Sequence, residues 1–308
     1  MALQPHCAQL WRTKEAVYQQ RLARRQQMMP PPGVIDAMDR QGGWGLPGLF
    51  DFFEPEWICE SEERVGSYNG RWTAFGDGAK FVCGMDVLTP PCLVYSIGSS
   101  QEYRFEQTMS EVTGCEIHTF DPSFKDPAGR QGAHTKRFWG ANFSTFHKRK
   151  LSLSYTVSDM MRELNHTGRR LDVLKIDCEQ CEWSCVPPIA EQVSAGTLSI
   201  GQLLVEVHDA RLSNGSVHRF FGSLSRANFR LFHKERNHWG CLGYKCLEYA
   251  FVHRSHAHAA FELTHCPSRQ RKPRPEEDLP FDKTWADAMR ALPGAVPGVR
   301  ADKAAAVF

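Results

Sequence analysis

Three side chains suited to proton transfer or metal binding stand at the ends of two apolar runs. Asp177 follows the run at 171–176, and Glu206 and His208 close the run at 202–208. Side chains alternate along a strand, so Glu206 and His208 project to the same side. Together with Asp177 they could provide a general base, His208 or Asp177, or bind a divalent metal ion. Alternatively, His208 is a structural core histidine that is hydrogen-bonded to a glutamate and has no catalytic role.

A second set of candidates combines a glycine turn with an acid at the end of the next expected strand. Gly98 and Ser99 follow the run at 93–97, and Asp121 ends the run at 116–120. Where a strand turns into a helix, glycine lets the backbone approach a ligand, and an acid at the tip of the next strand can accept bonds from both hydroxyls of a ribose. An Asp-Pro turn cap is the alternative for Asp121. A dinucleotide fingerprint has three glycines, and only one stands here, which disfavours a nicotinamide-dependent oxidoreductase.

The elements that would position these residues alternate between strands and helices, which predicts an α/β fold with a mostly parallel sheet. Two later runs joined by turn-forming residues predict a terminal antiparallel hairpin. The expected strands are 93–97, 116–120, 135–139, 172–176 and 202–207, with the hairpin at 229–233 and 247–253. The expected helices are 102–113, 156–166, 182–194 and 214–227.

Composition shifts divide the chain into four segments. Residues 1–32 hold an amphipathic helix at 7–29 that ends at three prolines and looks like an appendage, and 33–91 form an irregular lead-in or cap. Residues 92–266 are the α/β domain, and 267–308 are a charged, proline-rich tail with one short helix at 285–292. The histidines at 253, 256, 258 and 265 predict a solvated loop, with a metal site as the alternative.

Length and charge exclude several classes of protein. A chain of 308 residues with 42% hydrophobic residues can bury a full core. The net charge of +2 gives no field to gather nucleic acid, which is not expected as a partner. No apolar run approaches the length of a membrane span, and the absence of a secretory signal favours a cytoplasmic location. The sequence does not fix the oligomeric state.

The cysteines leave the compartment open. The chain has 11 of them, an odd and high number that fits neither a regular disulfide scaffold nor an ordinary cytosolic enzyme. We expect buried free thiols, with disulfides or a metal site as alternatives.

Several ordered motifs resemble a methyltransferase-like family. They are Cys92–Ser99, Phe105-Glu106, Phe120–Pro122, Leu174–Glu179, Leu204–His208 and Cys246–Val252, with a similar lead-in at 59–64 and 77–83. Relatives in that family include the animal methyltransferase-like twenty-four proteins, and FkbM-type O-methyltransferases are more distantly similar. Gln180 stands where the FkbM-type pattern usually has glycine.

The resemblance implies a Rossmann-like class I methyltransferase sheet that uses S-adenosylmethionine. Gly98 and Ser99 would lie beside the methionine part of this cofactor, and Asp121 would bind its ribose. The acceptor is unknown, and we expect it to be an oxygen of a sugar, a glycan or another small molecule. A divalent cation bound by Asp177, Glu206 and His208 is a separate expectation. A non-catalytic binding protein that keeps the fold is the alternative function. Some relatives enter the secretory pathway behind an amino-terminal anchor, which keeps that location open.

Overall fold

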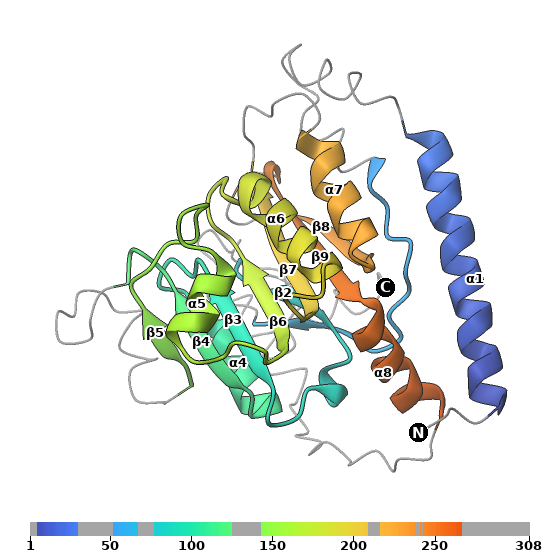
Figure 1. Cartoon of the computed structure of the whole chain (residues 1–308), viewed down its shortest axis with the longest axis horizontal. Helices are drawn as coiled ribbons and strands as arrows, with labels where there is room; N and C mark the ends of the chain where they lie inside the picture. The colour runs from blue at the N-terminus through green and yellow to red at the C-terminus, as the bar shows by residue number, and fades with distance from the viewer. Residues whose placement is uncertain are drawn as a thin grey trace, which may run out of the picture. The chain divides into compact units, whose positions relative to one another are not determined.

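The protein is described by a computed structural model (Figure 1). The structure describes residues 5–29, 52–66, 77–124, 143–208, 216–237, 241 and 243–266.

A sheet of seven strands forms the centre of this part of the chain. Its order is β5-β4-β3-β6-β7-β9-β8, in which β3 to β7 run parallel and β9 pairs antiparallel with both β7 and β8. The strands are β3 (Leu93–Ile97), β4 (Glu116–Phe120), β5 (Thr145–His147), β6 (Leu171–Ile176), β7 (Ile200–His208), β8 (Phe229–Asn237) and β9 (Gly243–His253). This confirms the mostly parallel sheet with a terminal antiparallel hairpin.

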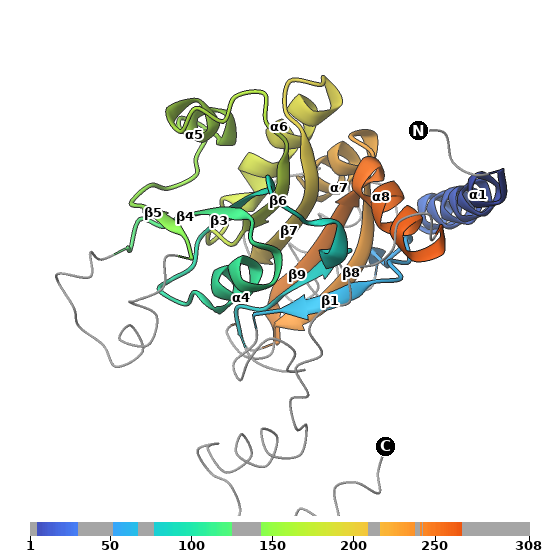
Figure 2. The same ribbon diagram turned by 90° about the horizontal axis from the view of Figure 1, so that it is seen from below.

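Helices cover both faces of the sheet (Figures 1 and 2). Alternate strand residues enter two cores: Leu203 and Val205 join the first, whereas Leu204 between them joins the second. The first core includes side chains of α5 (Val157–Glu163), α6 (Glu182–Ser194) and α7 (Ser216–Arg226). The second includes side chains of α1 (Pro5–Met28), α4 (Arg104–Thr113) and α8 (Arg254–His265). Burial on both faces explains why the central strands read as apolar runs rather than alternating ones.

A short hairpin on the α4 side brings further residues to the sheet. Strands β1 (Glu62–Val65) and β2 (Lys80–Cys83) pair antiparallel, and the 3-10 turn η1 (Met85–Val87) follows. Val82 and Cys83 are buried in the second core, so this hairpin packs against β7 and β9. No periodicity predicted this hairpin, because each of its strands has only four residues.

The expectation of free thiols is wrong for ten cysteines. Five disulfides join them, and Cys185 is the one free thiol among the described cysteines. The pairs are Cys7–Cys266, Cys59–Cys83, Cys92–Cys115, Cys178–Cys181 and Cys241–Cys246. The sequence separations of the pairs range from 3 to 259 positions, so no common spacing revealed the pairing.

The helix α1 is fastened by more than its disulfide. The Trp11 ring packs at a steep angle to those of Phe261 on α8 and Trp57, with ring centroids 5.2 and 5.5 Å away. The buried guanidinium of Arg230 lies 4.3 Å from the Trp57 ring and forms an ion pair with Glu15. The amino-terminal helix therefore packs on β8 and α8.

Most other predicted elements are confirmed within a few residues. The histidine-rich segment is an exception, because it forms α8 and His256 is buried, with its ring bonded to the carbonyl of Cys83. The strand expected at 135–139 and the helix at 285–292 lie outside the described residues. None of the described helices is long and apolar enough to cross a membrane.

Candidate functional site

The candidate residues gather at one edge of the sheet. Strands β3, β4, β6 and β7 are parallel, so their carboxyl ends meet there. Gly98 follows β3, Asp121 follows β4, Asp177 follows β6, and His208 ends β7. The sequence therefore placed all four correctly at this edge.

The turn after β3 is held between its two neighbouring strands. The amide of Gly98 donates to the carbonyl of Phe120, and the ammonium of Lys175 donates to the carbonyl of Gly98 at 2.5 Å. Gly98 has φ +76°, and a Cβ at this position would lie 1.6 Å from the carbonyl oxygen of Asp177. In this structure the need for glycine comes from the backbone after β6.

Asp121 binds the same turn from the other side. One carboxylate oxygen accepts from the amides of Ser99 and Ser100 at 2.8 and 2.6 Å, and from the Ser99 hydroxyl at 3.3 Å. The other oxygen accepts from the amide and hydroxyl of Ser123 at 2.7 and 2.5 Å. Burial acts to raise the pKa of Asp121, but these hydrogen bonds outweigh it and the pKa is lowered. Asp121 is therefore a buried, ionised acceptor beside the glycine turn.

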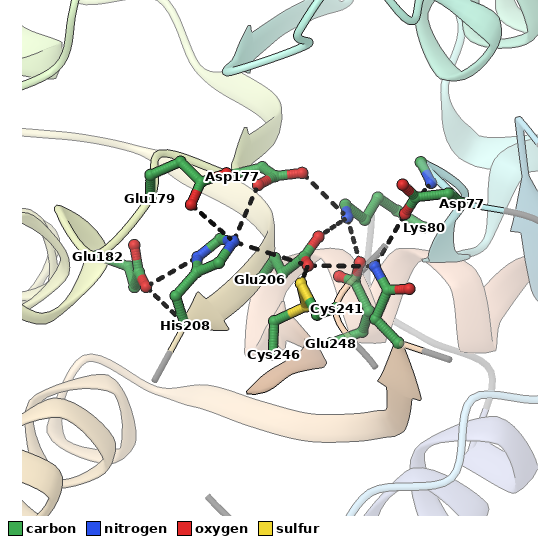
Figure 3. Close-up of a disulfide and its surroundings, with 12 residues drawn as sticks. Asp77, Lys80, Asp177, Glu179, Glu182, Glu206, His208, Cys241, Cys246 and Glu248 are labelled. Atoms are coloured by element: carbon green, nitrogen blue, oxygen red, sulfur yellow. Dashed lines mark hydrogen bonds and ion pairs between the residues drawn. A yellow bond between two sulfur atoms is a disulfide. The ribbon is translucent and has the colours of Figure 1, made fainter. Parts of the chain in front are cut away.

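A buried lysine from β2 lies among the acids of the neighbouring strands (Figure 3). The Lys80 ammonium contacts Glu248 and lies 3.1 Å from Glu206 and 3.6 Å from Asp177. Glu206 and Glu248 are paired across β7 and β9. Burial would lower the pKa of Lys80, yet the three carboxylates raise it well above its ordinary value. Burial and Glu206 raise the pKa of Glu248, whereas Lys80 holds that of Glu206 down against burial.

His208 is surrounded by carboxylates in the same cluster (Figure 3). Its Nδ1 lies 3.1 Å from Glu182, and its Nε2 lies 3.7 Å from both Asp177 and Glu206. Burial acts to lower the pKa of His208, but Glu182 and the other acids raise it to about 9. Burial raises the pKa of Asp177 to about 6, against the opposing effect of Lys80. At neutral pH His208 is thus a cation and Asp177 an anion.

A family model described as a methyltransferase domain matches residues 14–253, which is most of the chain. The chain belongs to this methyltransferase domain family. The probable methyltransferase-like protein 24 of Rattus norvegicus is 31% identical over 175 residues, which cover 50% of this chain and 46% of the relative. The protein of the same description from Homo sapiens is 30% identical over 179 residues, covering 51% and 46%. The chain therefore spans about half the length of the curated relatives it matches.

Solved methyltransferases are similar to this methyltransferase domain at low identity. Magnesium protoporphyrin IX methyltransferase of Synechocystis, solved with bound SAM, has a TM-score of 0.33 and 13% identity, covering 53% of this chain and 71% of that one. A putative S-adenosylmethionine-dependent methyltransferase of Listeria monocytogenes has a TM-score of 0.35 and 9% identity, covering 55% and 96%. The class I methyltransferase fold follows from the strand order of the sheet itself.

Lys80, Glu182 and Glu248 of the methyltransferase domain were not predicted as site residues. A single charge within the apolar run 79–83 was the available signal for Lys80. Glu248 could have been found only by pairing β9 with β7, which places it opposite Glu206. These two glutamates are 42 positions apart in sequence (248 − 206).

The predicted metal ligands Asp177, Glu206 and His208 do come together, and their metal role stays a prediction. Lys80 already places a positive charge between Asp177 and Glu206, with which an ion would compete. Cys241 and Cys246 lie close to Glu206 and His208, but their disulfide removes the thiolates that bind metal ions.

The segment after Asp177 has an unusual backbone. Glu179 and Gln180 have φ values of +53° and +81°, a region that favours glycine. The glycine that FkbM-type sequences usually have at the Gln180 position agrees with this geometry.

Proposed function

We propose that this chain transfers a methyl group from S-adenosylmethionine to a hydroxyl oxygen of a sugar or another small acceptor. The observation that carries the proposal is the buried, ionised Asp121 bonded to the glycine turn, in a chain of the methyltransferase domain family. The oxygen acceptor rests on the similarity to FkbM-type enzymes.

Asp121 fits the ribose of this cofactor. Three of its bonds come from backbone amides and hold the carboxylate in place, whereas two come from the hydroxyls of Ser99 and Ser123. Serine hydroxyls can rotate away, which frees one lone pair on each carboxylate oxygen. Two vicinal hydroxyls of a ribose can take these positions.

Asp177, next to the glycine turn and beside His208, is suited to accept the proton that the acceptor hydroxyl loses. When bound, S-adenosylmethionine supplies a methyl group on a positively charged sulfur. The carboxylate of Asp177 is ionised at neutral pH and its side chain is 24% exposed, so it can accept the proton of a hydroxyl. His208 is already protonated, with its Nδ1 beside Glu182. As a cation next to Asp177, it holds that carboxylate in position.

Binding of S-adenosylmethionine tests the first half of the proposal. We expect calorimetry to detect binding to the wild-type chain and Asp121→Asn to weaken it about 100-fold or more, because hydrogen bonds to a charged group contribute about 1.5–3 kcal/mol each. Ser123→Ala should bind at least as tightly as wild type, because its hydroxyl need not be displaced.

The matched control is Asp172→Asn on β6, whose carboxylate accepts from the amide of Leu93 at the other end of the strands. Its affinity for the cofactor should equal that of wild type. No heat of binding to wild type, or equal affinity in Asp121→Asn, would overturn the cofactor assignment.

The proton acceptor is tested by methyl transfer itself. With labelled S-adenosylmethionine and a panel of hydroxylated small molecules, we expect kcat/KM to rise with pH through about 6 as Asp177 ionises. Asp177→Asn should lower the rate about 10²- to 10⁴-fold and remove this rise. Added magnesium or a chelator tests the predicted metal ligands in the same assay. Cofactor binding without transfer to any acceptor would favour the non-catalytic alternative.

A further inference from the structure

A cluster of three histidines and a glutamate lies on the face of the sheet opposite to Lys80. Glu116 and His118 belong to β4, and His166 lies between α5 and β6. The ring of His118 packs 5.6 Å from Tyr95, which belongs to the core beneath α5. Glu116 is the first residue of β4, whereas Asp121 follows its last, so the cluster is separate from the candidate methyl-transfer site.

The ligand atoms of this cluster are spaced almost as around a metal ion. One oxygen of Glu116 lies 2.9 Å from His118 Nε2 and 3.1 Å from His166 Nε2, and the three atoms lie within 4.8 Å of one another. Tetrahedral zinc with bonds of about 2.0–2.2 Å separates its ligand atoms by roughly 3.3–3.5 Å. The Glu116 oxygen is about 0.2–0.6 Å closer to each histidine nitrogen than this spacing, so the side chains would have to move apart to admit the ion.

Each of the three side chains has a partner that would orient it toward the ion. His118 Nδ1 lies 2.9 Å from His147 Nε2, and His166 Nδ1 lies 2.7 Å from the Tyr95 hydroxyl. The second oxygen of Glu116 accepts from Arg169 at 2.7 Å. Ligands of zinc sites are commonly held by such outer hydrogen bonds, which fix the tautomer of each histidine.

We propose that Glu116, His118 and His166 bind a zinc ion. Both histidine side chains are 8% exposed, whereas that of Glu116 is 44% exposed, so the ion can enter from solvent on the Glu116 side. Without the ion, both Nε2–H groups donate to Glu116. With it, both protons move to the Nδ1 atoms, where His147 and Tyr95 accept them, and water supplies a fourth ligand.

The ion would bind β4 and the segment after α5 directly, and would support β5 only through the hydrogen bond between His118 and His147. Strand β5, which carries His147, has three residues and pairs only with β4 among the described strands. His166 lies after α5, so a bond from zinc to His166 and one to His118 would hold this connection against β4. The site is therefore structural in its effect and independent of the proposed methyl transfer.

Equilibrium dialysis of the disulfide-bonded full chain against zinc ions tests the proposal. We expect wild type to bind zinc at this cluster, and His166→Gln and Glu116→Gln to lose about 100-fold or more in affinity. His147→Phe removes an outer partner and should lose about 10- to 100-fold. The melting temperature of wild type, but not of His166→Gln, should rise with added zinc.

His258→Gln is the matched control, because His258 and Glu262 of α8 also form a histidine–glutamate pair, at 3.5 Å. Its zinc affinity should equal that of wild type. X-ray absorption of the zinc-loaded wild type should show nitrogen and oxygen ligands, which keeps the test valid if a variant fails to fold. Absence of zinc binding, sulfur ligands, or equal affinity in wild type and His166→Gln would overturn the proposal.

Discussion

Lys80→Met should strongly lower the stability of the protein, because Lys80 is the buried cation among three acids of the candidate site. The substitution keeps most of the buried volume but leaves Glu206, Glu248 and Asp177 without the cation between them. Removal of one partner from a buried ion pair costs about 3–5 kcal/mol. Whole domains unfold with about 5–15 kcal/mol, so we expect a melting temperature about 10 °C or more below that of wild type.

The pH dependence identifies the cause of this loss. Without Lys80, burial raises the pKa values of the remaining acids in the folded state above their unfolded values. The variant should therefore lose stability as pH rises from about 4.5 toward neutrality. Glu248→Gln in the Lys80→Met background should recover part of the loss, and Lys148→Met at an exposed position should have no effect. Equal melting temperatures for Lys80→Met and Lys148→Met would contradict the buried ion cluster.

Gly98→Ala should prevent the glycine turn from forming in its present position. The new methyl group would lie 1.6 Å from the Asp177 carbonyl oxygen, and a backbone atom cannot rotate away as a side chain can. We expect a fall in melting temperature of about 10 °C or more, or no folded protein, together with loss of S-adenosylmethionine binding. Thermal unfolding and calorimetry measure the two effects.

Gly168→Ala separates steric overlap from backbone strain. Gly168 has φ +82°, close to that of Gly98, but no atom lies within 4 Å of a Cβ built there. It should lose only about 1–2 kcal/mol, the cost of a left-handed conformation for alanine. A similar loss in both variants would show that the approach of Asp177 to Gly98 is not what requires glycine.

The central strands were predictable because each is a short run of consecutive residues that are buried in the sheet. Leu93–Ile97 and Glu116–Phe120 form strands with the predicted bounds, and each is followed by a turn-forming residue. Parallel order then placed Gly98, Asp121, Asp177 and His208 at one edge. Local sequence and one topological rule were sufficient for this part of the site.

The electrostatic part of the site depends on contacts between distant residues. Lys80 reaches Glu248 across 168 positions, and its hairpin has no periodic pattern. His118, His147 and His166 come from β4, β5 and the segment after α5, so no spacing rule connects them. The disulfides were missed for a different reason, because two of the five join cysteines only 3 and 5 positions apart and the number of cysteines gives no information on which thiols meet.

The bond between Cys7 and Cys266 has a mechanical consequence. These residues are 259 positions apart, so the covalent chain between them is a closed ring that contains every strand of the sheet. Tension applied at the two ends of the chain is carried by the sulfur–sulfur bond and bypasses the sheet. The domain thus transmits a pulling force without unravelling until a reductant cuts this link.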